Sequence, residues 1–91
     1  MVPSRLKAAR LRANLTQEKL GVLAGIEEAT ARSRISQYES GIHRPTFEMM
    51  CAFAKVLNVP EGYFYTVDNE FAKRLLTAYE DWIFSENKIE N

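Results

Sequence analysis

The chain has 91 residues and a formal net charge of zero, with 46% hydrophobic and 26% charged residues, as expected for one small soluble globular domain. A membrane-spanning helix is excluded because no apolar run approaches about 18 residues, and residues 1–10 lack the apolar segment of a secretory signal. Cys51 is the single cysteine, which excludes an internal disulfide and fits a reducing, cytoplasmic location.

The charges are distributed unevenly along the chain. Residues 1–55 hold nine Lys or Arg and five acids, a net charge of +4, whereas residues 56–91 hold three and seven, a net of −4. A basic N-terminal half and an acidic C-terminal half suit a protein that binds phosphate with one end and another partner with the other.

The first predicted helix spans residues 4–13. Ser4 is a candidate N-cap, and Asn14 is a residue that tolerates the left-handed conformation that ends a helix. Three apolar residues are expected on its inner side: Leu6, Ala9 and Leu11.

Two short helices joined by a turn follow. Thr16 is a good N-cap for the first of them, and Gly25 ends it because glycine enters the left-handed conformation without a steric penalty. Ile26 is expected to fill the turn, and the second helix is predicted at about 29–40, ending at Gly41.

Beyond Pro45, a helix capped by Thr46 is predicted to end at Leu57 or Asn58. Apolar residues recur along it at steps of three and four, which predicts that they face inward: Phe47, Met50, Cys51, Ala54 and Leu57. Cys51 is therefore expected to be a buried, inert thiol. Pro60 then begins a short fifth helix, in which Tyr63 and Phe64 close the core.

Residues 68–91 predict a C-terminal amphipathic helix, with a frayed end from Asn87 onward. Its apolar stripe either folds back on its own domain or packs on a second copy, and we favour a dimer because residues 1–67 already form a closed domain. The expected interface consists of Phe71, Leu75, Tyr79, Trp82 and Ile83.

The order and spacing of five segments resemble the lambda-repressor-like (Xre-type) helix-turn-helix family over about two-thirds of the chain. The segments are Leu6–Arg10, Leu15–Leu20, Ile35–Gly41, Pro45–Thr46 and Ala54–Tyr65. The resemblance implies an all-α fold, in which a five-helix DNA-binding domain is followed by the C-terminal helix. The chain departs from the family pattern between Gly25 and Ile35, where it has several extra residues, assigned to Glu27–Thr30.

A helix that enters the major groove reads bases with the exposed side chains of its N-terminal turns. The predicted base-reading residues are therefore Arg32, Ser33, Ser36 and Gln37. Arginine pairs in a bidentate manner with guanine, and glutamine does so with adenine.

The resemblance also implies that Gln17, at the N-terminus of its helix, binds a DNA phosphate, where free backbone N–H groups favour anions. Further candidates for phosphate contacts are Arg44, Arg34 and Lys19. Arg10 and Glu39 interrupt inward-facing stripes, and in the resembling family these positions form a structural ion pair.

We expect a DNA-binding transcriptional regulator, a repressor that acts as a homodimer on a pseudo-palindromic operator. The alternative is a helical protein-interaction module, for example antitoxin-like, because the net charge is zero and Glu27 and Glu28 flank the reading helix. An enzyme is disfavoured because the chain lacks a catalytic triad, a phosphate loop and a metal-ligand spacing, and His43 has no partner. No cofactor, metal, membrane or small-molecule substrate is predicted.

Overall fold

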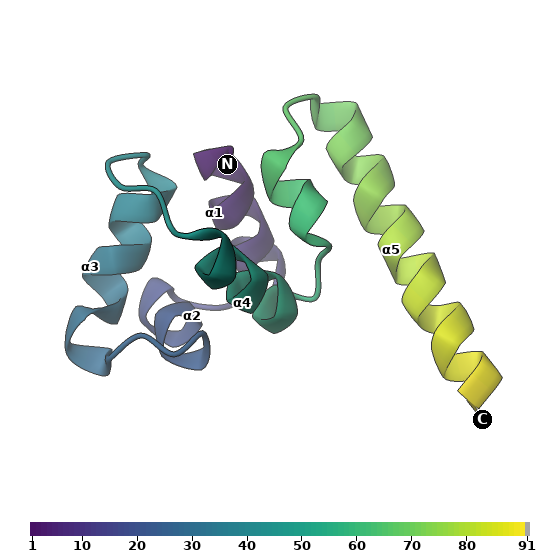
Figure 1. Ribbon diagram of the computed structural model, residues 1–91, viewed down its shortest axis with the longest axis horizontal. Coiled ribbons are helices and arrows are strands. Elements are labelled where there is room, and N and C mark those ends of the chain that lie inside the picture. The colour runs from purple at the N-terminus through teal and green to yellow at the C-terminus, as the bar shows by residue number, and fades with distance from the viewer. Residues whose placement is uncertain (91) are drawn as a thin grey trace.

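The computed structural model describes the backbone of residues 1–90 and the side chains of residues 1–85. In chain order the elements are α1 (Pro3–Arg12), α2 (Gln17–Leu23), α3 (Glu28–Glu39), α4 (Phe47–Leu57), the 3-10 helix η1 (Glu61–Tyr65) and α5 (Asn69–Glu90). No strand occurs in residues 1–90, so the prediction of an all-α fold is confirmed. Helix α1 lies between α3 and η1, and α5 runs along the outside (Figure 1). No helix in this part of the chain combines the length and the apolar character needed to cross a bilayer.

The helix ends follow mostly from local chemistry. The hydroxyl oxygens of Thr16 and Thr46 accept hydrogen bonds from the backbone N–H groups of the residues three positions later. The residues predicted to end helices have left-handed backbones: Asn14 and Asn58 (both φ 58°), Gly25 (φ 98°) and Gly41 (φ 80°). The prediction for Ser4 is wrong, because α1 begins one residue earlier, at Pro3, and Val2 is the N-cap.

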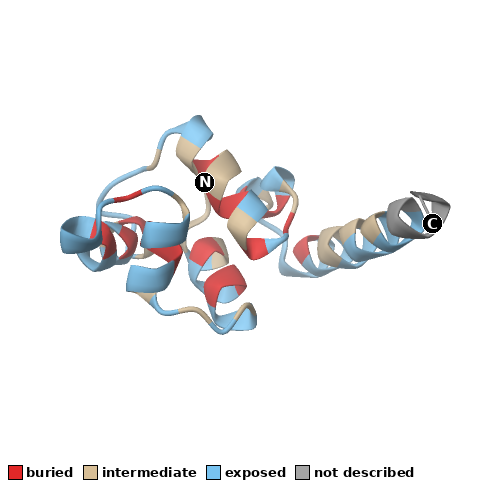
Figure 2. Ribbon diagram, turned by 90° about the horizontal axis from the view of Figure 1, so that it is seen from below, coloured by how far each residue is buried: buried red, intermediate tan, exposed pale blue. Residues whose placement is uncertain are grey.

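The hydrophobic core lies where α1 to α4 and η1 face one another (Figure 2). Its largest fully buried side chains are Phe53, Phe64, Leu6, Leu20, Ile35, Met50, Leu57 and Val59. Two predicted core residues are instead exposed, Leu11 by 55% and Phe47 by 61%. Leu11 points about 140° away from the buried Leu6 around α1, and Phe47 lies at the edge of the apolar stripe in the first turn of α4. Cys51 is half-buried rather than buried.

Helix α5 folds back on its own domain over its first turns. The Asp68 carboxylate caps the helix by accepting a hydrogen bond from the Phe71 N–H (2.8 Å). Ala72 is buried, and Leu76 packs against the core. An ion pair between Arg12 and Glu80 (3.1 Å) ties the helix to α1. The helix continues to Glu90, so the prediction of a frayed end from Asn87 onward is wrong for the backbone of residues 87–90, and Asn91 lies outside the described residues.

Candidate nucleic-acid interface

Helices α2 and α3 form a tightly packed pair around the turn at Gly25. Ile26 is buried beneath the turn, and its N–H donates to the carbonyl oxygen of Gly21. Gly21 is itself buried in α2, at a point where a Cβ atom would lie 2.7 Å from the Cβ of Ala31 in α3. A larger residue at position 21 therefore does not fit without movement of one helix.

The extra residues lengthen α3 at its N-terminus. Glu27 is the N-cap residue, and the helix begins at Glu28, so three of the four residues from Glu27 to Thr30 form its first turn. The start of the helix lies within one residue of the predicted start at position 29. Both glutamates are exposed, and the Glu27 side chain makes no capping hydrogen bond.

The predicted base-reading residues lie on the outer side of α3. The inner side consists of Ala31, Ile35 and Tyr38, which are buried in the core. Arg32, Ser33 and Ser36 are exposed, and Gln37 is half-buried; these are the residues that the sequence assigns to base reading.

A hollow of about 680 Å³ lies along one side of α3, where this helix faces α1 and α2. It is lined by Lys7, Arg10, Thr16, Gln17, Glu18 and Arg32. The structure thus brings Arg32, predicted to read bases, together with Gln17, predicted to bind phosphate. At the edge of this hollow, two exposed cations, Lys7 and Arg32, outnumber one exposed acid, Glu18.

A second hollow, of about 340 Å³, lies on the other side of α3. It is lined by Arg34, Gln37, Tyr38, His43 and Arg44. Two of the predicted phosphate ligands, Arg34 and Arg44, therefore lie together, and His43 joins them. The fourth candidate, Lys19, is exposed on α2 and is not among the residues that line either hollow. The exposed face of α3 thus has cations on both sides.

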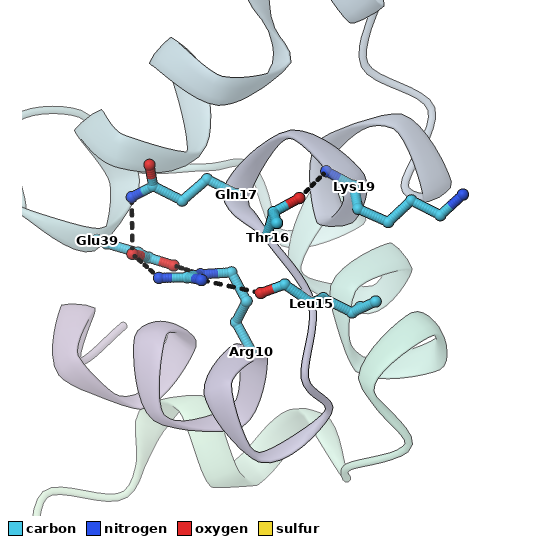
Figure 3. A network of polar contacts seen from close by, with 6 residues as sticks. All are labelled: Arg10, Leu15, Thr16, Gln17, Lys19 and Glu39. Atoms are coloured by element: carbon cyan, nitrogen blue, oxygen red, sulfur yellow. Dashed lines mark hydrogen bonds and ion pairs between the residues drawn. The ribbon is translucent and has the colours of Figure 1, made fainter.

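A buried polar network holds α3 against α1 and α2 (Figure 3). Arg10 Nε donates to Glu39 at 2.6 Å and Arg10 NH2 donates at 3.2 Å, so the predicted ion pair is present in a bidentate form. Arg10 NH1 donates to the Leu15 carbonyl oxygen at 2.9 Å. Gln17 Nε2 donates to Glu39 at 3.1 Å.

The network fixes the orientation of the Gln17 side-chain amide. A glutamine amide has two N–H donors, and one of them is used by Glu39. The predicted phosphate contact of Gln17 would use the second donor, at the N-terminus of α2. Arg10 is 8% exposed and the Glu39 side chain 5%, so the carboxylate that orients this amide is itself held in a nearly dry site.

Arg5, to which the sequence analysis assigned no role, is a positioning residue. Its Nε donates to the Thr66 carbonyl oxygen and its NH2 to the Val67 carbonyl oxygen, both at 3.0 Å. NH2 also donates to Asn69 Oδ1 at 2.9 Å, and the guanidinium lies 5.8 Å from the centre of the Tyr63 ring. Arg5 therefore fixes the connection between η1 and α5 to helix α1.

The fold and this arrangement of α2, turn and α3 define a helix-turn-helix protein. A helix-turn-helix family model matches residues 6–64, which is more than half of the chain. The chain therefore belongs to the lambda-repressor-like (Xre-type) helix-turn-helix family, as its motifs predict.

Among solved structures, the chain is similar to one described as the crystal structure of transcriptional regulator BswR. The two share 37% sequence identity with a TM-score of 0.85, and the match covers 99% of this chain and 93% of that one. Because the match includes nearly all of both chains, it extends beyond the family region to the C-terminal helix. A search of curated proteins gave no match.

Proposed function

We propose that this protein is a sequence-specific, double-stranded DNA-binding transcriptional regulator that reads the major groove with α3. The observation that supports this most directly is the position of the exposed face of α3 between two hollows with cationic edges. The similarity to a transcriptional regulator over nearly the whole chain supports the same function.

The dimensions of B-form DNA explain why cations on both sides matter. Its major groove is about 12 Å wide and admits a helix of about 10–12 Å diameter, so the phosphates of the two strands flank the helix. Lys7 and the Gln17 amide would meet one strand, and Arg34 and Arg44 the other. These contacts would position the helix, whereas Arg32, Ser33, Ser36 and Gln37 would face the base edges.

We further propose that the protein is a repressor that occupies a promoter as a homodimer, with two reading helices about 34 Å apart on a pseudo-palindromic operator. Helix α5 supports a dimer because only part of its apolar surface is covered. Phe71 is 55% exposed and Trp82 is 58% exposed. Of the expected interface residues, Leu75, Tyr79 and Ile83 are half-buried, and Tyr79 lines a groove against α4. We therefore place the centre of the interface at Phe71 and Trp82.

The alternative is a protein-interaction module without DNA binding, which the same exposed aromatic residues and the zero net charge favour. Titration of a fluorescent random-sequence duplex at low salt separates the two functions. We expect binding at micromolar protein, with an affinity that falls steeply as salt rises because counterions are released from phosphates. Absence of binding under these conditions would leave the interaction module as the better proposal.

Charge-matched variants make this test specific for the surface around α3. The double change Arg34→Ala with Arg44→Ala is expected to weaken binding to every sequence and to reduce the slope of log affinity against log salt by about two. The control is Lys73→Ala with Arg74→Ala, which removes the same charge from exposed positions on α5. An equal loss in both variants would show that net charge, rather than this surface, governs binding.

A further inference from the structure

The first turn of α3 also has exposed positions, which precede the base-reading set that begins at Arg32. The helix begins at Glu28, so Ala29 lies in its first turn. Ala29, Ser33 and Ser36 are spaced by four and three residues, which places them in one row on the helix surface. All three are exposed and small, so the helix backbone along this row can come close to the floor of a groove.

The first turn is also held in a fixed position. Ala31, two residues after Ala29, is fully buried and packs against Gly21 with no room for a Cβ atom there. Residues two apart in a helix point about 200° away from each other, so the packing of Ala31 on α2 directs Ala29 outward. Ala29 therefore lies on the rigid part of the reading helix and not on a mobile turn.

We propose that Ala29 is a specificity-determining residue that selects thymine within each half-site. This inference rests on the proposed function. In a docked reading helix the N-terminal residues contact base edges, and the only interaction open to the Ala29 methyl group is an apolar contact. The thymine C5-methyl group is the apolar group that a base edge presents in the major groove.

The acidic residues beside Ala29 disfavour a phosphate contact at this end of the helix. Glu27 and Glu28 are exposed and repel phosphates, so the first turn is unsuited to a contact with the DNA backbone. Glu28 lies one helical turn before Arg32, whose charge offsets its own when the helix approaches DNA. Ala29 lies about 6 Å along the helix from Ser33, a distance of roughly two base pairs at about 3.4 Å each.

The test begins with selection of duplexes from a random pool by the full-length chain. We expect thymine at a position roughly two base pairs from the position whose preference changes in Ser33→Ala. Each thymine in the selected site is then replaced in turn by deoxyuridine, which removes only the C5-methyl group. At the proposed position, wild-type affinity should fall by about fourfold, which corresponds to one buried methyl group.

The matched protein variant is Ala29→Gly, which removes the methyl group from the other side of the contact. This variant should be insensitive to deoxyuridine at the proposed position, whereas Ser33→Ala should remain as sensitive there as the wild type. Because sensitivity is compared within each protein, a general loss of stability in Ala29→Gly does not affect the result. Replacing the thymine by 5-methylcytosine, opposite guanine, should retain more wild-type affinity than unmodified cytosine.

The outcomes separate this inference from the function on which it rests. If wild-type protein selects no duplex, both are overturned. If it selects an operator but deoxyuridine has the same effect on wild type and Ala29→Gly at every thymine, the assignment to Ala29 is overturned and the proposed function stands.

Discussion

Replacement of Glu39 by alanine tests whether the buried network holds the reading helix in place. The Glu39 carboxylate accepts three hydrogen bonds, two from Arg10 (2.6 and 3.2 Å) and one from Gln17 (3.1 Å). Without it, the Arg10 guanidinium would retain only the Leu15 carbonyl oxygen as an acceptor, at a site where Arg10 is 8% exposed. The variant thus leaves a buried charge without its counter-charge.

The expected loss is large compared with the stability of a small domain. Breaking a buried ion pair by removing one partner costs about 3–5 kcal/mol, out of a total free energy of unfolding of roughly 5–15 kcal/mol. With a urea dependence of about 2 kcal/mol per molar, the midpoint of unfolding should fall by about 2 M. Circular dichroism at 222 nm during urea titration measures this shift. Glu18→Ala, at an exposed position of α2, is the control and should change stability by less than about 0.5 kcal/mol.

A double-mutant cycle tests the cause of the loss. Glu39→Ala should destabilise the protein because it leaves the Arg10 charge unpaired. If so, the double variant with Arg10→Ala should lose much less free energy of unfolding than the two single variants lose together. The coupling between contacting, charged groups should then reach at least about 1.5 kcal/mol. Additivity within about 0.5 kcal/mol would refute the reasoning, because it would mean that each side chain stabilises the fold independently of the other.

Three further predictions concern the other elements. Gly21→Ala should destabilise the protein by about 1–3 kcal/mol in thermal or urea unfolding, because the new Cβ would lie 2.7 Å from that of Ala31. Since alanine favours helices, unchanged or raised stability would contradict the close packing. Arg5→Ala should increase hydrogen exchange at the start of α5, and Arg5→Lys should restore little because an ammonium lacks the fork that contacts three acceptors; full rescue by lysine would contradict this reading. Trp82→Ser should shift the protein from dimer to monomer in light scattering. The control Phe84→Ser removes an exposed aromatic residue from the opposite side of α5 and should leave the dimer intact. Equal behaviour of the two variants would contradict the proposed interface.

The parts of the fold that were predicted from the sequence depend on interactions within three or four residues. Thr16 and Thr46 cap helices by bonding to the third residue beyond them, and Gly25 and Asn58 end helices through their own backbone conformations. Periodicity likewise identified Met50, Ala54 and Leu57 as buried residues of α4. These signals are complete within a short window of sequence, so no knowledge of the tertiary structure is needed to use them.

The features that were missed depend on contacts between distant segments. The acceptors of Arg5 are 61 to 64 residues away, and Glu80 is 68 residues from Arg12, so nothing near either arginine indicates a partner. Leu11 was assigned to the core by the spacing of its helix, but spacing alone does not show how wide a face the neighbouring elements cover. The first turn of α3 did leave a local signal, since glutamate is favoured where a helix begins.

Helix α1 is linked through three arginines to α3, to the connection before α5 and to α5 itself. Arg10 binds α3 through Glu39, whereas Arg5 binds the connection to α5 and Arg12 binds α5 itself. Arg5 and Arg12 are seven residues apart and therefore lie on the same side of α1, whereas Arg10 is turned about 140° from Arg5 around the helix. Helix α1 lies between α3 and α5, the two elements that these arginines hold (Figure 1). In a dimer that assembles through α5, the distance between the two reading helices would therefore be transmitted through α1. A substitution that loosens Arg5 should then alter the preferred spacing of operator half-sites while leaving the bases read within each half-site unchanged, whereas a change at Ala29 should do the reverse.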